Sequence, residues 1–239
     1  MKAEHCVPPL GYPWRAMRYT IVAIAVAVLT AGTVFAQPAT LPVEDWKKDP
    51  VGRKGLPSGW QSQTWGSPKY DFSIEADGDG RVLHMKSQNE GSTMSKEIKF
   101  DIRQFPILQW RWKAVVLPNG ADSRKKATDD QACQVYVTFP RTPQAIRSRN
   151  IGYVWDTTAP AGTIAPSEKT GTVTYVIVRS GAADLNQWVT ETRNVLEDYK
   201  KIYNQDPGEN VGAVSVAIDS NDTQSTAECF VGEIFFKKS

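Results

Sequence analysis

The sequence is poor in the residue types that most catalytic and metal sites require. Its 239 residues include two histidines and three cysteines, and one of each lies within the first six residues. One histidine and two cysteines are too few for a structural zinc site. A Ser-His-Asp or Cys-His site would have to use His84, and no Gly-x-Ser-x-Gly or phosphate-loop motif is present. His84 lies in a strand-like run and is interpreted as a strand residue.

Long apolar runs are also absent, with one exception near the start of the chain. Residues 17–36 read MRYTIVAIAVAVLTAGTVFA, in which Arg18 precedes an apolar segment, and Val34 and Ala36 fit a small-residue cleavage pattern before Gln37. This predicts a secretory signal peptide over residues 1–36, because the apolar run is too short for a typical membrane span. The leader is unusually long, so Met17 is a candidate for the true start. The alternative is an uncleaved membrane anchor.

The sequence also lacks an excess of either basic or acidic residues over residues 37–239. Residues 1–36 contain three of the 28 basic and one of the 26 acidic residues, which leaves 25 of each in residues 37–239. A net charge of zero argues against nucleic acid or an anionic membrane as the main partner. The remaining 203 residues suffice for a single domain with a core. We expect a periplasmic or secreted domain over residues 37–239, with no membrane span after cleavage.

Two cysteines remain in that segment, Cys133 and Cys229. Both lie in strand-like runs, CQVYVTF and CFVGEIFF. In an oxidising compartment the pair is a candidate disulfide. Two buried free thiols would explain the same pattern, so both readings stay open.

Many short runs of β-branched and aromatic residues predict a mainly β fold. Turn-forming clusters such as LPNGADSRKKATDD separate these runs, and YDFSIEADGDGRVLHMKS predicts a hairpin around DGDG. Strands without alternating helices favour an antiparallel β-sandwich or jelly roll. One amphipathic helix is expected over residues 186–205, packed across an end or edge of the sandwich.

In QWRWK, residues 109–113, two tryptophans alternate with two cations. On a strand, Trp110 and Trp112 would share the core face and Arg111 would point to the other side. Asp129 and Asp130 directly precede the next strand, and we expect one of them to receive Arg111. An ion pair between Arg111 and one of these aspartates would fix a loop or line a polar ligand cleft. The alternative is that Arg111 and Lys113 lie on a solvent-exposed face of the strand.

The order of motifs resembles the bacterial domain-of-unknown-function family 3047, from about Leu41 to Ser239. The resemblance rests on a series of segments: GLPSGW, LQWRWK, ATDDQACQVYVTF, GYVWDTTAPAGT, VRSG, WVTETRNVLEDYKKIY and AIDSNDTQSTAECFVGEIFF. It implies an envelope or secreted β-sandwich of the kind that includes galactose-binding and carbohydrate-binding modules, and it implies no particular activity. Members of the family often carry a cation where this chain has Gln134.

The favoured interpretation is a non-catalytic module that binds a glycan or another polar envelope ligand. Aromatic side chains stack on sugar rings, and planar charged groups hydrogen-bond to hydroxyls. The predicted ligand-binding residues are Arg111, Asp129, Asp130, Tyr136, Tyr153, Trp155 and Arg179. The alternative for Tyr153 and Trp155 is an ordinary place in the core.

Two other functions remain as alternatives. A glycoside hydrolase or polysaccharide lyase would need facing carboxylates, for which Asp129 or Asp130 opposite Glu233 or Asp156 are the candidates. An envelope protein-interaction module would show a flat apolar patch. No cofactor is expected, although Asp219 and Asp222 in the oxygen-rich loop DSNDTQST would suit calcium. The alternative is a polar turn closed by side-chain hydrogen bonds, which explains the same residues.

Overall fold

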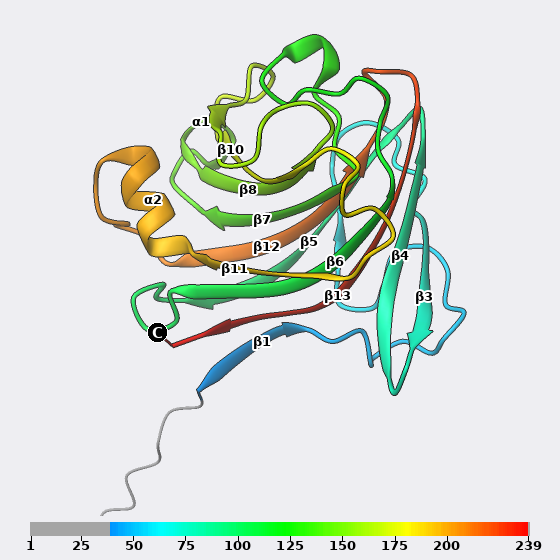
Figure 1. The fold of residues 1–239 in the computed structure, drawn as a ribbon. Helices are drawn as coiled ribbons and strands as arrows, with labels where there is room; N and C mark the ends of the chain where they lie inside the picture. Colours follow the sequence, from blue (N-terminus) through cyan, green and yellow to red (C-terminus); the bar gives the residue numbers. More distant parts are fainter. Residues whose placement is uncertain (1–38, 239) are drawn as a thin grey trace, which may run out of the picture. The chain divides into compact units, whose positions relative to one another are not determined.

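Two β-sheets packed face to face form the fold in the computed structural model, which describes residues 39–238 (Figure 1). The predicted signal peptide over residues 1–36 and the candidate start at Met17 lie outside the described residues. Within residues 39–238, no helix has both the length and the apolar character needed to cross a membrane. The mainly β sandwich predicted from the sequence is confirmed.

The first sheet, sheet A, has six strands. Its order is β11-β6-β13-β4-β3, and β1 pairs with β13. The strands span β1 Thr40–Glu44, β3 Asp71–Asp77, β4 Gly80–Gln88, β6 Ile107–Val116, β11 Val189–Asn194 and β13 Thr226–Lys237. The predicted hairpin is β3–β4, and its turn uses Gly78 at a φ of 56°, a left-handed conformation that glycine adopts without strain.

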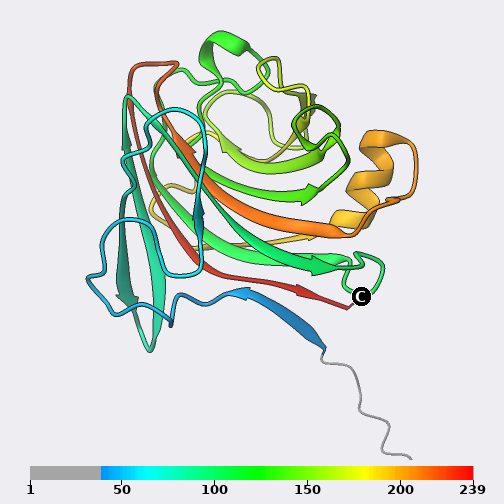
Figure 2. The same ribbon diagram turned by 180° about the vertical axis from the view of Figure 1, so that it is seen from behind.

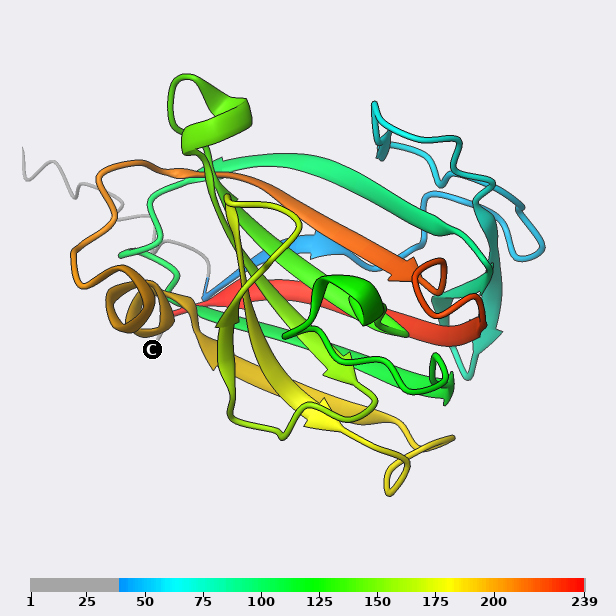
Figure 3. The ribbon, with the colours of Figure 1, turned by 90° about the horizontal axis from the view of Figure 1, so that it is seen from above.

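The second sheet, sheet B, has seven strands in the order β2-β5-β12-β7-β8-β10-β9. They span β2 Gln61–Ser62, β5 Gly91–Phe100, β7 Cys133–Phe139, β8 Arg149–Asp156, β9 Ile164–Pro166, β10 Val173–Ser180 and β12 Val211–Asp219. Neighbouring strands in both sheets run antiparallel, except β8 and β10, which are parallel. Figure 3 shows the two layers from above.

The core between the sheets is rich in tryptophan. Trp110 and Trp112 on β6 are fully buried, as predicted. Their rings contact sheet B through Tyr153 and Trp155 of β8, with centroid distances of 5.4 and 6.1 Å. Alternation along β6 therefore directs both tryptophans of QWRWK inward and Arg111 outward.

A disulfide joins the two sheets through this core. Cys133 on β7 and Cys229 on β13 are bonded, with their Cα atoms 5.8 Å apart and both side chains buried. The sequence left open whether these cysteines are bonded or free, and in the structure they form a disulfide.

The helix expected over residues 186–205 is only half helical. Residues 189–194 form β11 and pair with β6, and the helix α2 spans Val195–Tyr203. Asn194 separates the two elements, because its side chain accepts a hydrogen bond from the amide of Glu197 and caps the helix. The sequence-based boundary was wrong because β11 satisfies the free edge of β6, which local periodicity does not report.

Helix α2 lies at one end of the sandwich (Figure 2). Tyr199 of α2 packs edge-on against Phe139 of β7, with ring centroids 4.7 Å apart. Two shorter helical segments, α1 Gln144–Arg147 and the 3-10 turn η1 Lys126–Thr128, lie in connecting loops. Because β12 runs from the α2 end of the sandwich to Asp219, its carboxyl end marks the opposite end.

Candidate functional site

A polar cavity of about 430 Å³ opens where β12 ends. Several loops far apart in the sequence meet there with the outer face of sheet B. The lining side chains that carry charge or an aromatic ring are Trp65, Glu90, Asp129, Lys169, Tyr175 and Asp219. The fold therefore builds a concave site from segments that are up to about 150 residues apart.

Asp129 and Asp219 are joined by one glutamine. Val216 and Ile218 of β12 face the core, so alternation turns Asp219 outward. Its Oδ1 accepts hydrogen bonds from the backbone amide of Gln131 at 2.7 Å and from Gln134 Nε2 at 2.8 Å. The side chain of Gln131 donates from Nε2 to Asp129 Oδ1 at 2.7 Å. Gln131 thus holds both carboxyl groups at the same wall of the cavity.

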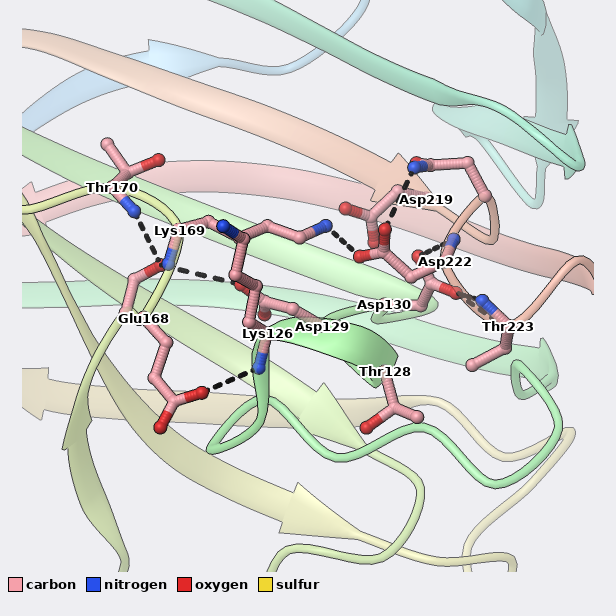
Figure 4. Close-up of polar contacts among 12 residues, drawn as sticks. Lys126, Thr128, Asp129, Asp130, Glu168, Lys169, Thr170, Asp219, Asp222 and Thr223 are labelled. Atoms are coloured by element: carbon pink, nitrogen blue, oxygen red, sulfur yellow. Dashed lines mark hydrogen bonds and ion pairs between the residues drawn. The ribbon is translucent and has the colours of Figure 1, made fainter.

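Asp129 is buried and Asp219 is half-buried, and the pKa values of both carboxyl groups are raised. Burial is the largest cause for each group. The neighbouring charges of Asp130 and Asp129 raise the pKa of Asp219 further, whereas the Gln131 amide and Lys169 lower it. Asp129 is 2% exposed and receives hydrogen bonds from neutral donors, among them Tyr175 Oη at 3.2 Å. Figure 4 shows these carboxyl groups together with Lys169.

Asp130 has a structural role, because its carboxylate accepts hydrogen bonds from the loop that follows β12. It accepts hydrogen bonds from the amide of Asp222 at 3.1 Å and from the amide and hydroxyl of Thr223, both at 2.6 Å (Figure 4). Lys169, from the loop between β9 and β10, forms an ion pair with Asp222 across the cavity rim. Asp130 therefore fixes a wall of the cavity and is itself fully buried.

Tyr175 forms the floor beside these acids, and Tyr136 lies next to it on the other side of a glycine. Tyr136, Gly152 and Tyr175 are adjacent across β7, β8 and β10. A Cβ atom on Gly152 would lie 2.6 Å from the Tyr136 ring and 3.2 Å from the Tyr175 ring. The absence of a side chain at Gly152 thus allows both rings to lie on the sheet. Tyr136 Oη donates to Gln134 Oε1 at 2.5 Å, which links the floor to Asp219 through Gln134.

Trp65 stands at the rim with 62% of its surface exposed. Its backbone is held in place, because Gln63 Nε2 donates to the Trp65 carbonyl at 2.8 Å while Gln63 Oε1 accepts from the amide of Thr93 at 2.6 Å. The loop is therefore anchored to β5 while the indole remains open to solvent. An exposed indole at the edge of a polar cavity is a platform for a flat, partly apolar ligand surface.

Arg111 lies elsewhere. Its guanidinium pairs with Asp77 at 2.6 Å on the outer face of sheet A and stacks over the Trp188 ring at 4.5 Å. The expected pairing with Asp129 or Asp130 was wrong, because β6 belongs to sheet A and the two aspartates lie at the end of sheet B. Arg179 is also remote from the acids, and it forms ion pairs with Asp184 and Glu191.

Tyr153 and Trp155 belong to the core. They are 0% and 1% exposed, and each polar atom has a partner: Tyr153 Oη donates to Asp198 at 2.9 Å, and Trp155 Nε1 donates to the Gly181 carbonyl at 3.1 Å. Their side of β8 faces sheet A, so neither side chain is placed to stack on a ligand. Of the residues predicted to bind ligand, Asp129 lines the cavity and Asp130 and Tyr136 support it.

The other predicted acidic sites do not form. Within residues 39–238, no group of three or more histidine, cysteine or acidic side chains is arranged to hold a metal ion. Asp222 is paired with Lys169, and Asp219 faces Gln131 and Gln134 instead of a second ligand. Asp156 is fully buried and accepts hydrogen bonds from Ser123, Thr158 and Ala159. Glu233 is an exposed residue of sheet A, and neither Glu233 nor Asp156 lines the cavity with Asp129.

The sequence analysis missed Trp65, Glu90, Lys169 and Tyr175 as cavity residues. Trp65 offered one signal: it is a tryptophan in a turn-rich, polar segment, QTWGSPKY, where no strand or helix would bury it. Lys169 and Glu90 carry no such local signal. They belong to the site because their loops converge in three dimensions.

These features define a disulfide-linked β-sandwich with an acidic cavity and an exposed tryptophan at one end. The family model described as Protein of unknown function (DUF3047) matches residues 58–235, so the chain belongs to that family. No curated protein matches the chain.

Among solved structures, similar folds include two modules of Clostridium thermocellum cellulases. The family 11 carbohydrate-binding module of Lic26A-Cel5E has 9% identity and a TM-score of 0.43, covering 85% of this chain and 97% of that one. The family 30 carbohydrate-binding module of Cel9D-Cel44B has 10% identity and a TM-score of 0.41, covering 84% and 97%. A xyloglucanase domain of NopAA from Sinorhizobium fredii has 10% identity and a TM-score of 0.43, covering 78% and 98%. These likenesses are remote, and the assignment of the site rests on this chain's own residues.

Proposed function

We propose that the protein is a non-catalytic glycan-binding module whose binding site is the cavity at the end of β12. The observation that carries this proposal is the placement of Trp65, a largely exposed indole, at the rim of a cavity lined by hydrogen-bonding side chains. Sugar rings present apolar C–H faces that stack on aromatic rings, and their hydroxyl groups need polar partners. The site offers both in one place.

The dimensions support the same proposal. A volume of about 430 Å³ lies in the range of small-molecule sites, which is roughly 300–1,000 Å³. The open polar rim suits a ligand that remains partly in solvent, as a sugar unit within a chain does. A compartment outside the cytoplasm, periplasmic or extracellular, belongs to the proposal, and the Cys133–Cys229 disulfide supports it.

A second candidate, glycoside hydrolysis, is favoured by the pair Asp129 and Asp219. Hydrolases that act through two carboxyl groups need one of them protonated near neutral pH. The pKa values of Asp129 and Asp219 are both raised, and both side chains line the cavity. The candidate pair differs from the one expected from the sequence, since Asp219 replaces Glu233 or Asp156.

A retention assay tests both functions. The protein is incubated with peptidoglycan and with a panel of insoluble polysaccharides, and the supernatants are assayed for protein and for released reducing ends. Retention without release is expected. Trp65→Ala should reduce retention at least tenfold, and Ile146→Ala serves as a matched control, since Ile146 is a 75% exposed apolar residue on α1, beyond the far end of β7.

Each outcome decides between the functions. Release of reducing ends that disappears in Asp219→Asn would establish the hydrolase instead of the binding module. Neither retention nor release would overturn both proposals and leave the envelope protein-interaction module. Equal losses in the Trp65 and Ile146 variants would show that retention does not involve the cavity.

A further inference from the structure

The cavity contains more acidic than basic side chains. Three acids line it: Glu90, Asp129 and Asp219. Within residues 39–238, none of the three forms an ion pair within 4 Å, and their hydrogen-bond donors are backbone amides, two glutamines, a serine and a tyrosine. The one lining cation, Lys169, is bound to Asp222. The carboxyl groups therefore lack a matched positive charge of their own.

A bare metal ion does not fit this distribution. The acids are spread along a cavity of about 430 Å³, and no three of the described histidine, cysteine or acidic side chains converge on one point. Calcium needs about six to eight oxygen ligands at 2.3–2.6 Å. The cation that fits this cavity is therefore an organic cation, which is larger than a metal ion.

One further polar atom beside Asp129 lacks a hydrogen-bond partner. The Oε1 atom of Gln131 is buried and accepts no hydrogen bond within the described part of the chain, although Gln131 is fully buried and its Nε2 donates to Asp129. A buried acceptor without a donor is unfavourable. Since both atoms belong to one amide group, the unpartnered oxygen lies beside the Asp129 carboxyl group. Gln131 itself does not line the cavity, so a ligand amine would meet the Asp129 carboxyl group that Gln131 holds.

We propose that the cavity selects glycans with free amino groups, such as glucosamine oligosaccharides, over their N-acetylated, neutral or acidic counterparts. This inference rests on the proposed glycan-binding function and names its ligand class. A protonated sugar amine supplies a positive charge and several N–H donors. The same ligand presents a ring face to Trp65, whose indole also attracts cations.

The pKa values of Asp129 and Asp219 give this selection a measurable signature. An ammonium group nearby favours the charged form of a carboxyl group and so lowers its pKa. The charged or titratable groups that face the two acids from neighbouring segments are Glu90, Asp130, Tyr136, Lys169 and Tyr175. Binding of the amine should therefore release protons from the acids whose pKa values burial has raised.

The test is isothermal titration calorimetry with protein produced from the full 239-residue sequence, at mildly acidic pH where sugar amines are protonated. The probes are a β-1,4-linked glucosamine hexamer, its fully N-acetylated counterpart, a galacturonate hexamer, spermidine and calcium chloride. N-acetylation removes the charge but keeps the rings and the linkage. We expect the glucosamine hexamer to bind at least tenfold more tightly than any other probe, with a heat that depends on the buffer's ionisation enthalpy.

Two variants locate the selectivity. Asp129→Asn with Asp219→Asn keeps the shapes of the side chains and should remove the preference for the amine. Asp77→Asn, on the outer face of sheet A, is the matched control and should leave it unchanged. Because both side chains accept hydrogen bonds in the fold, the circular dichroism spectrum and melting temperature of the double variant are compared with those of the unsubstituted protein. An unfolded double variant is replaced by the two single variants, each of which should reduce the preference.

The experiment distinguishes a failure of the amine selectivity from a failure of the proposed glycan binding. Equal binding of the glucosamine and N-acetylglucosamine hexamers would overturn this inference and leave the glycan-binding function standing. Spermidine or calcium binding as tightly as the glucosamine hexamer would show that charge alone is recognised, and would overturn the inference too. A preference that survives in the folded double variant would exclude the two aspartates as its source. No binding by any saccharide would remove both proposals.

Discussion

Breaking the disulfide between Cys133 and Cys229 should destabilise the fold strongly. The bond closes a loop over a sequence separation of 96 residues. In the chain-entropy model, a cross-link over about 100 residues stabilises the folded state by about 4.7 kcal/mol at 25 °C, because it restricts the unfolded chain. For a domain of this size, 1 kcal/mol corresponds to about 2–4 °C in melting temperature. Replacing both cysteines by alanine should therefore lower the melting temperature by about 9–19 °C.

Differential scanning calorimetry of the oxidised protein and of the double variant measures this effect. The matched comparison is the unsubstituted protein, reduced while unfolded and refolded in reductant, which loses the bond but keeps both sulfur atoms. It separates the cross-link from the loss of buried sulfur. A shift below about 2 °C in both samples, with unchanged circular dichroism, would refute the loop-entropy reasoning.

Three further predictions concern the cavity. Asp219 has a raised pKa in the folded state, so its contribution to stability is present below its unfolded pKa and is lost as pH rises through the folded value. Asp219→Asn can keep both hydrogen bonds to Oδ1, so it should melt higher than the unsubstituted protein at pH 7, and thermal melts should show the difference vanishing below about pH 4. Gly152→Ala should displace the Tyr136 ring and destabilise the fold by about 1–3 kcal/mol in urea denaturation, and an unchanged midpoint would contradict the 2.6 Å approach. Asp130→Ala leaves three donors of the loop after β12 without their acceptor and should destabilise by about 2–4 kcal/mol, with faster hydrogen exchange at residues 222–225 as the local readout.

The sequence predicted most strands and which residues share a face. It could not always predict which face is buried. On β6 and β7 one side is polar, so the burial of Trp110 and the outward position of Tyr136 followed from alternation. On β8 both sides are buried, which alternation does not report, and Val154 is as buried as Tyr153. Nothing local therefore indicated that Tyr153 and Trp155 belong to the core and not to a ligand site.

The cavity was harder to predict for a different physical reason. Asp129 drew attention because it lies beside a second acid before a strand, but its partners depend on the tertiary fold. Trp65 and Lys169 reach the same cavity from loops separated by about 100 residues. Their convergence depends on strand order within sheet B, and residue spacing along the chain does not encode that order.

The loops around the cavity are each held by a few hydrogen bonds, some of them to residues far away in the sequence. The Trp65 loop is tied by Gln63 to β5, the loop after β12 is closed by Asp130, and the loop before β10 is closed by the Ser167 hydroxyl, which accepts from two backbone amides. The frame, in contrast, depends on the tryptophan core and the disulfide. We therefore expect that loop sequences can be varied while the frame continues to fold, provided that Gln63, Asp130 and Ser167 are kept as anchor points. The domain is thus a natural starting scaffold for selecting binders with new specificities.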